Sequence, residues 1–276
     1  MTAQKLTHFI GGKEVSAPTP LESLNPSNTS EIIATFPEGT AEDVNAAVEA
    51  ARKAQPAWAA ASPEVRSDVL DKAGSIILER KDTIGKLLAR EEGKTLPEAI
   101  GETARAGRIL KYFAGEALRR HGQNLESTRP GVEVQTYREA VGVYGLIAPW
   151  NFPIAIPAWK LAPALAFGNT VVLKPANPTP ATAHALISVL HEAGLPAGVA
   201  NMVLGRGNVG DALAKHPDVN GISFTGSQAV GSKVAAAAVA RQARIQMEMG
   251  GKNPLVVTMP AERPKLPALH RSSASS

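Results

Sequence analysis

Phe224-Thr225-Gly226-Ser227-Gln228-Ala229-Val230-Gly231 joins an apolar run that begins at Val219 to an alanine-rich segment that ends at Ala240. A strand, a glycine turn and a helix in this order direct free backbone N–H groups at an anion. Gly226 would let a pyrophosphate approach the backbone, and the Ser227 hydroxyl would supply a further donor. An ordinary strand-to-helix turn with a serine N-cap explains the same residues equally well. The choice between the two interpretations depends on the rest of the chain.

Strand-like and helix-like runs alternate around this octapeptide from residue 141 onward. The predicted strands cover residues 141–147, 170–173, 200–204, 221–224 and 244–247. The helical patterns between them cover residues 154–167, 179–192, 209–215 and 228–240. Strands joined by helical crossovers predict an α/β fold with a doubly wound, parallel, five-stranded Rossmann-like sheet. Its ligand crevice should lie at the carboxyl ends of the strands.

A helical N-terminal segment is predicted to precede this sheet. One helix begins at Thr40 and another at Ser62, and two more cover residues 83–92 and 97–120. Their outer faces are polar and carry no catalytic cluster, so they are expected to be scaffold. Short extended elements complete this half of the chain. They are a hairpin over residues 7–15, an extended segment over 26–37 and an exposed strand over 131–139.

Composition excludes several classes of function. The 276 residues carry a net charge of +4 and no stripe of basic and aromatic residues, so nucleic-acid binding has little support. No apolar run approaches the length of a membrane span, and the N-terminus leads into no signal-peptide core, so we expect a cytoplasmic protein. The chain contains no cysteine, which excludes disulfides, thiolate metal sites and a thiol nucleophile. No metal site is predicted.

Polar and glycine residues follow every predicted strand, where a ligand crevice would collect them. They are Asn151, then Lys174 and Asn177, then the run from Gly205 to Gly210, then Gly226 and Ser227, and finally Glu248. Gly205-x-Gly207-x-x-Gly210 matches the dinucleotide-binding fingerprint, but it follows the third strand rather than the first. It is therefore assigned only a secondary role, with Gly207 on the adenine side of a cofactor.

Four of these motifs together resemble the aldehyde dehydrogenase superfamily. They are Pro149-Trp150-Asn151-Phe152-Pro153, Lys174-Pro175-Ala176, the octapeptide at 224–231 and Glu248-Met249-Gly250-Gly251-Lys252. Their order and approximate spacing are those of the family. The resemblance covers residues from about 9 to 257, which is about the first half of the family's length, so the catalytic domain is expected to be missing.

The resemblance implies three catalytic residues. The Asn151 amide would donate a hydrogen bond to the aldehyde oxygen and stabilise the oxyanion, and the alternative is a buried turn amide. Glu248 would be the general base, and the alternative is a surface carboxylate. Lys160 is similar to a family lysine near the general base, and a solvated lysine is the competing interpretation.

The resemblance also implies a site for NAD or NADP. Lys174 would bind the adenosine ribose, Ser227 the pyrophosphate, and Trp150 would line the slot unless it is an ordinary buried aromatic. Asn177 stands where many NAD-preferring relatives carry Glu, which gives a slight preference for NADP. The remaining candidate cofactor-binding residues are Gly207, Gly226, Gly231 and Met249.

The implied reaction converts an aldehyde, water and NAD(P)+ into the carboxylic acid and NAD(P)H. The segment from Pro149 to Leu173 resembles enzymes that oxidise semialdehydes carrying a carboxylate, such as 2-oxoglutarate semialdehyde. Family members use a cysteine nucleophile. Because this chain has none, it is expected to be inactive alone, and a non-catalytic dinucleotide-binding module, a pseudo-enzyme or a non-functional truncation product is the alternative.

Residues 1–257 are therefore predicted to form the cofactor-binding domain. Within it, residues 131–139 would be part of an oligomerisation flap, since the intact family member is expected to be a homo-oligomer acting on a small aldehyde. Residues 258–276 lack the upstream periodicity. In a shifted reading frame, the codons for Thr258-Met259-Pro260 are compatible with Asp-Asp-Ala, which resembles the sequence that follows at this point in the family. The tail is therefore either the product of a frameshift or a genuine disordered tail.

Overall fold

The computed structural model describes residues 3–17, 20–119, 122–251 and 253–256. Its helices begin where the sequence carries N-terminal signals. Thr40 accepts the backbone N–H of Asp43, whose carboxylate accepts the Thr40 N–H in return, and Ser62 caps the next helix. The helices are α1 (Ala41–Ala60), α2 (Pro63–Glu79), α3 (Lys81–Glu92), α4 (Leu96–Ala117), α5 (Ala155–Ala166), α6 (Pro180–Glu192), α7 (Gly207–Lys215) and α8 (Gln228–Ala240).

The central sheet has the strand order β12-β11-β8-β9-β10-β2-β3. The five strands from β12 to β10 run parallel, as predicted from the alternation of strands and helices. The strands are β2 (His8–Ile10), β3 (Lys13–Val15), β8 (Val143–Ile147), β9 (Thr170–Lys174), β10 (Ala200–Met202), β11 (Gly221–Gly226) and β12 (Arg244–Met249).

The prediction of a five-stranded, purely parallel sheet is wrong in the number of strands and in their direction, because two further strands join the sheet. The N-terminal hairpin of β2 and β3 joins the same sheet in antiparallel orientation, so that Phe9 pairs with Met202 of β10. His8 and Phe9 are buried at this junction. Without the hairpin, β10 would present an unpaired edge, and covering such an edge removes a site of aggregation. The sheet is therefore mixed and seven-stranded among the described residues.

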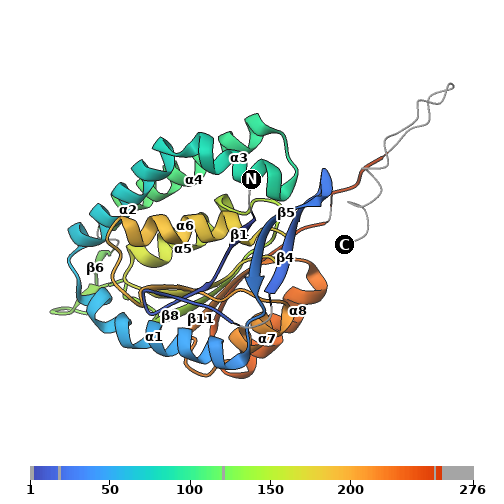
Figure 1. Ribbon diagram of the computed structural model, residues 1–276. Helices are drawn as coiled ribbons and strands as arrows, with labels where there is room; N and C mark the ends of the chain where they lie inside the picture. Colours follow the sequence, from blue (N-terminus) through green and yellow to red (C-terminus); the bar gives the residue numbers. More distant parts are fainter. Residues whose placement is uncertain (1–2, 18–19, 120–121, 252, 257–276) are drawn as a thin grey trace.

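Helices cover both faces of the sheet (Figure 1). The crossovers α5 and α6 lie on one face together with α2, α3 and α4, and α1, α7 and α8 lie on the other. The chain leaves β8 toward β9 and β10 and later returns to β8's other side with β11. The strand order thus reverses between β8 and β11, and ligands bind at such switch points beyond the carboxyl ends of the strands.

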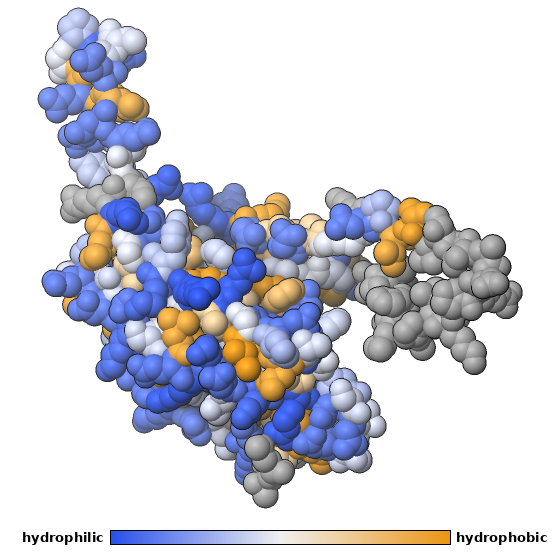
Figure 2. All heavy atoms as spheres, turned by 90° about the horizontal axis from the view of Figure 1, so that it is seen from above, coloured by the Kyte–Doolittle hydropathy of each residue, from blue (hydrophilic) through white to orange (hydrophobic). Residues whose placement is uncertain are grey.

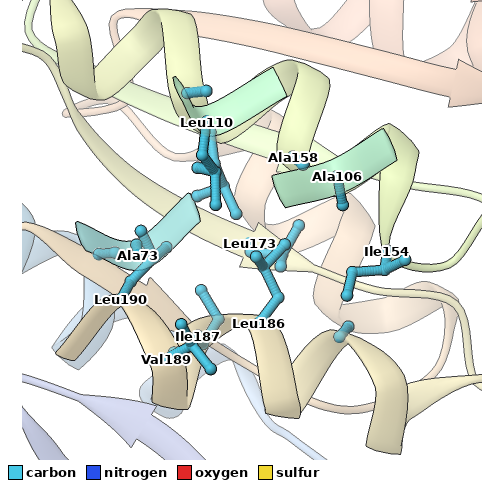
Figure 3. Packing of buried hydrophobic residues seen from close by; sticks show 14 of the residues in the cluster. Ala73, Ala106, Leu110, Ile154, Ala158, Leu173, Leu186, Ile187, Val189 and Leu190 are labelled. Carbon is cyan, nitrogen blue, oxygen red and sulfur yellow. The ribbon is translucent and has the colours of Figure 1, made fainter. Parts of the chain in front are cut away.

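The largest apolar cluster fills the space between the sheet and the first helical layer. Figure 3 shows side chains of α2, α4, α5 and α6 converging on Leu173 of β9. The side chains around it are fully buried, among them Ala73, Ala106, Leu110, Ile154, Ala158, Leu186, Ile187 and Leu190. This packing holds α4 and α5 against each other and fixes the loop that precedes α5.

Two smaller sheets stand outside the central one. The first contains β1 (Gln4–Lys5), β5 (Asn28–Pro37) and β4 (Pro20–Asn25) in the order β1-β5-β4. The second is a ribbon of β6 (Asn124–Glu126) and β7 (Glu133–Gln135), which Figure 2 shows as an arm standing away from the body. The strand predicted over 131–139 is therefore present in a shorter form, as β7. The exposed apolar side chains of the ribbon and its turn include Leu125, Val132 and Val134.

The last described residues, 253–256, form no strand. Leu255 and Val256 are exposed and form no ladder. A strand there would need a neighbouring strand to satisfy its backbone and a second layer to cover its apolar side chains. Lys252 and the predicted tail at 258–276 lie outside the described residues.

Candidate functional site

The strand ends that carry the predicted site residues lie at the same edge of the sheet. Ile147 at the end of β8 pairs with Lys174 of β9 on one side and with Phe224 of β11 on the other. Thr225 in turn pairs with Glu248 of β12. The expected convergence of the loops after these strands is therefore present.

Asn151 lies in the exposed loop between β8 and α5, and two residues of the helical layer hold that loop. The Lys94 ammonium donates to the Asn151 carbonyl at 2.9 Å and lies 4.3 Å from the centre of the Phe152 ring. The buried Glu102 carboxylate accepts Lys94 at 2.7 Å and the first backbone N–H groups of α5, from Ile154 and Ala155, at 3.1 Å each. The Asn151 side chain itself is exposed, so the alternative of a buried turn amide is wrong.

Trp150 is 55% exposed, which also contradicts the alternative of an ordinary buried aromatic. It borders a hollow of about 330 Å³ together with Pro178 and Thr179 from the loop after β9. The side chain is thus available to a ligand that lies across the loops following β8 and β9.

Lys160 and Glu248 share a cavity of about 510 Å³. Lys160 is only 8% exposed, which contradicts the interpretation of a solvated lysine. Its ammonium donates to the Ser223 hydroxyl at 2.7 Å, and that hydroxyl donates to the Gln246 amide oxygen at 2.5 Å. Burial lowers the pKa of Lys160 to about 8, and the Glu248 carboxylate acts in the opposite direction. Lys160 can therefore exchange a proton close to neutral pH.

Glu248 lines this cavity from β12 but is itself exposed. Its strand is the outermost in the central sheet, and no described strand pairs with its far side. The alternative of a surface carboxylate thus agrees with the exposure, while the position beside Lys160 agrees with a general base. The catalytic role stays a prediction.

Lys174 provides a half-buried cation at the end of β9. Burial lowers the pKa of its ammonium to about 8, and it donates to the Asn177 amide oxygen at 3.4 Å. No described carboxylate lies within ion-pair distance of it. A half-buried ammonium that has no carboxylate partner among the described residues is suited to bind anionic or hydroxyl groups of a ligand.

The loop after β9 is held by another buried carboxylate. Glu91 of α3 accepts the backbone N–H groups of Ala181 and Thr182 at 2.7 and 2.8 Å, and the Thr182 hydroxyl at 2.6 Å. Burial raises the pKa of Glu91 to about 7, while these donors oppose the shift. Glu91 therefore caps α6 in the same way that Glu102 caps α5.

The octapeptide at 224–231 forms the turn from β11 into α8. Ser227 stands at the N-cap with φ −70° and ψ 151°, and its hydroxyl makes no capping hydrogen bond. Ser227 and the first residues of α8 are exposed. This helix terminus thus presents unused donors, and it fits a phosphate group.

Close packing also explains why residues 226 and 231 are glycines, in addition to the cofactor-binding role predicted for them. A Cβ at Gly231 would overlap the Met249 sulfur and lie 3.0 Å from the Phe224 ring, and one at Gly226 would lie 2.7 Å from that ring. Met249 thus packs on α8, on the opposite face of β12 from Glu248. A position there beside the N-terminus of α8 is compatible with a role next to a bound cofactor.

The glycine fingerprint after β10 has a local structural explanation. Gly205 has φ +144°, and a Cβ there would lie 2.7 Å from the Gly39 nitrogen, so only glycine fits this turn. Gly207 begins α7 and has open space around it. Arg206 lies 3.8 Å from Glu38. The adenine-side role assigned to Gly207 stays a prediction.

Sequence reasoning missed Lys94, Glu91 and Glu102, because it treated the helical segment as scaffold. All three come from α3, α4 or the turn between them and act on loops more than 50 residues later. A local pattern carries no such signal. The only hint is acidic residues at positions that belong to the apolar face of a helix.

Within the described ranges, no group of three or more His, Asp or Glu side chains is arranged to hold a metal ion. In the same ranges, no helix combines the length and the apolar character needed to cross a bilayer.

Comparisons with known proteins agree with this geometry. A sequence model described as "Aldehyde dehydrogenase family" matches residues 13–268, which extends past residue 257. The chain is 46% identical over 258 residues to the alpha-ketoglutaric semialdehyde dehydrogenase of Bacillus subtilis, with 92% of this chain and 53% of that protein covered.

Two solved structures illustrate the likeness in three dimensions. The NAD-dependent aldehyde dehydrogenase of Sinorhizobium meliloti has a TM-score of 0.88 at 36% identity, covering 92% of this chain and 51% of that one. An NADP-dependent enzyme of E. coli has a TM-score of 0.87 at 34% identity, covering 90% and 52%. The chain thus spans about half the length of the relatives it matches.

Proposed function

The chain belongs to the aldehyde dehydrogenase family, and from this premise we propose that it forms the NAD(P)-binding part of an enzyme that oxidises an aldehyde to a carboxylic acid. The observation that carries the proposal is the pairing of two features at one sheet edge. Lys174 is a half-buried ammonium without a carboxylate partner among the described residues, and Ser227 begins a helix with unused donors. Together they suit the ribose and pyrophosphate of a dinucleotide.

Lys174 and Ser227 would hold the cofactor, whose nicotinamide would supply the hydride acceptor that aldehyde oxidation requires. The chain's own residues would bind and orient the reactants. The Asn151 amide would donate to the aldehyde oxygen, which the Lys94 and Glu102 contacts support by holding its loop. Glu248 would take a proton from the attacking water, and Lys160 would exchange a proton near neutral pH because its pKa is about 8.

The chain contains no cysteine, whereas the family's chemistry needs a thiolate that forms a thiohemiacetal before hydride transfer. We therefore propose binding without steady turnover for this polypeptide. A non-catalytic dinucleotide-binding module is the second candidate, and the absence of a thiol is the observation that favours it. Turnover of an aldehyde would require a thiol nucleophile in addition to the residues of this chain.

Isothermal titration with NAD+ and NADP+ tests the binding proposal. We expect both cofactors to bind, Lys174→Met to weaken binding about tenfold or more, and Ser227→Ala to weaken it less. Lys215→Met is a matched control, because Lys215 is exposed on α7 and paired with Asp211. Failure of both cofactors to bind the folded chain would refute the proposal.

Turnover is measured on the same samples by NAD(P)H absorbance after addition of an aldehyde. No steady formation of NAD(P)H is expected in preparations free of contaminating activity. Sustained turnover that is lost in Glu248→Gln would show that the chain is active without a thiol and would overturn this part of the proposal.

A further inference from the structure

A buried carboxylate holds the far end of the loop that carries Lys174 and Asn177. Glu91 of α3 is only 2% exposed, and it accepts the backbone N–H groups of Ala181 and Thr182 as well as the Thr182 hydroxyl. Ala181 and Thr182 belong to the first turn of α6, which follows the loop after β9. The position of this loop therefore depends on a residue of the helical layer.

The loop between β9 and α6 is short and stiff. It consists of residues 175–179, and prolines at positions 175 and 178 fix the φ angle at both places. The Ser23 hydroxyl of β4 donates to the Pro178 carbonyl at 2.8 Å and lies 3.4 Å from the Glu91 carboxylate. Because Asn177 stands between the two prolines, a movement at Glu91 is passed on to it.

Hydrogen-bond donors, rather than a cation, satisfy the Glu91 carboxylate. Charged and titratable groups of the neighbouring elements complete its surroundings. These are Glu22 of β4, Arg90 and Glu92 of α3, Lys94 of the following turn, Glu102 of α4 and His184 of α6. The two cations among them already pair with other carboxylates, Arg90 with Glu31 and Lys94 with Glu92 and Glu102. The charge of Glu91 is therefore held by its contacts with α6 and β4.

Glu91 changes its charge close to neutral pH. Burial raises its pKa to about 7, and the hydrogen bonds from Thr182, Ala181 and Ser23 oppose the shift. A protonated carboxyl carries a donor of its own and loses the charge that strengthens its hydrogen bonds, so its hold on α6 weakens. Burial lowers the pKa of His184, so that this neighbouring ring gains its proton only at more acid pH.

We propose that Glu91 is a positioning residue for cofactor binding, and that its ionised carboxylate holds the loop after β9 where Lys174 and Asn177 meet the adenosine ribose. This role rests on the proposed function, because that function assigns the ribose to these two residues. The ionised form of Glu91 then binds cofactor more tightly than the protonated form. By linkage, cofactor binding favours the ionised form and releases a proton.

Calorimetric titration of the full chain with NAD+ at several pH values tests this role, since NAD+ itself has no group that titrates near neutral pH. Affinity should fall by up to about tenfold as the pH drops from about 7.5 to about 6 and Glu91 gains its proton. Above about pH 8, affinity should fall again because Lys174 loses its charge. Near pH 6.5, buffers of different ionisation enthalpy should reveal proton release on binding.

Two variants assign the acid limb of this profile. Glu91→Gln should bind NAD+ about tenfold more weakly at about pH 7.5, lose the acid limb and the proton release, and keep the alkaline limb. Thr182→Val should move the acid limb to higher pH, because the Thr182 hydroxyl stabilises the ionised carboxylate. Thermal melts at each pH show that the variants are folded.

Thr170→Val is the matched control for Thr182→Val. It removes the hydroxyl of another fully buried threonine, which donates to the Ala51 carbonyl at 3.0 Å from the opposite end of β9. It should lower stability by a similar amount and leave the acid limb at the same pH. If Glu91→Gln does not fold, the profiles of the unsubstituted chain, Thr182→Val and Thr170→Val decide the question.

NAD+ binding by the folded, unsubstituted chain separates the two proposals. Binding that lacks an acid limb, that keeps it in Glu91→Gln, or that Thr182→Val does not shift would overturn the role of Glu91 and leave the proposed function standing. No binding at any pH would refute the proposed function, and the assignment of a ribose to this loop would fail with it. Binding with an acid limb that follows Glu91 and Thr182 supports both.

Discussion

Substitution of Asn177 by Glu should shift the cofactor preference of this chain from NADP toward NAD. The Asn177 amide oxygen lies 3.4 Å from the Lys174 ammonium. A carboxylate at the same place would hold that ammonium by an ion pair and would accept hydrogen bonds from the ribose hydroxyls. It would also repel the 2′-phosphate of NADP. All three effects act in the same direction.

The size of the shift follows from the burial of Lys174. Two opposite charges about 4 Å apart attract with about 4 kcal/mol at an effective dielectric constant near 20, before the desolvation of the new carboxylate is subtracted. A hydrogen bond to a charged group contributes about 1.5 to 3 kcal/mol net. The ratio of NADP affinity to NAD affinity should therefore fall by about one to two powers of ten. The pKa of Lys174, now lowered to about 8 by burial, should rise in the variant.

Calorimetry with both cofactors on both proteins measures this ratio, and Asn177→Gln is the matched control. Gln keeps an uncharged amide oxygen, so the ratio should stay within a few fold of the original. An unchanged ratio in Asn177→Glu, in protein that still binds NAD+, would show that residue 177 does not face the ribose. It would also remove the basis for the preference for NADP.

Three further outcomes test the fold. Burial lowers the pKa of His8, so the unfolded chain binds more protons than the folded chain as the pH falls below about 6.5. The free energy of unfolding should therefore fall as the pH drops through this range. In urea melts, His8→Asn should make this free energy less dependent on pH. Gly231→Ala should destabilise the protein by about 1 to 3 kcal/mol, because the new methyl group displaces Met249. Gly115→Ala should stabilise it by up to about 1 kcal/mol, because a methyl group there meets nothing within 4 Å. Melts in which both variants shift the stability in the same direction would contradict this. The chain should self-associate through the edge of β12 that no described strand covers, where Ile245 is 42% exposed. Ile245→Lys should reduce this association in light scattering, and a monodisperse monomer at high concentration would contradict the prediction.

Local patterns were sufficient to predict the parallel part of the sheet and its crossover helices. The predicted strand at 221–224 and helix at 228–240 appear as β11 and α8, because apolar runs, glycine turns and N-caps act within a few residues. Pairing over long distances is different. Nothing in the sequence near Phe9 indicates that it meets Met202, so local patterns predict the hairpin but not its place in the sheet.

The candidate site shows the same division. Asn151, Lys174 and Glu248 could be found because each lies close to the carboxyl end of a strand. Glu91 and Glu102 could not, because their partners are backbone N–H groups that any residue supplies. A carboxylate that caps a distant helix becomes visible only when the packing of α3 and α4 on α5 and α6 is known.

The hairpin of β2 and β3 is synthesised long before β10, the strand with which it pairs. The Gly11 N–H bonds to the Asn201 side chain, 190 residues away, at 2.9 Å, and the Leu204 N–H bonds to His8 at 3.0 Å. During synthesis the Phe9 side chain therefore stays exposed until β10 has left the ribosome. Contacts between residues so far apart in the sequence also slow folding. Nascent chains arrested before residue 200 should thus be bound by chaperones at their amino end. In refolding experiments with pulsed hydrogen exchange, the amides of β2 should gain protection after those of β8 and β9.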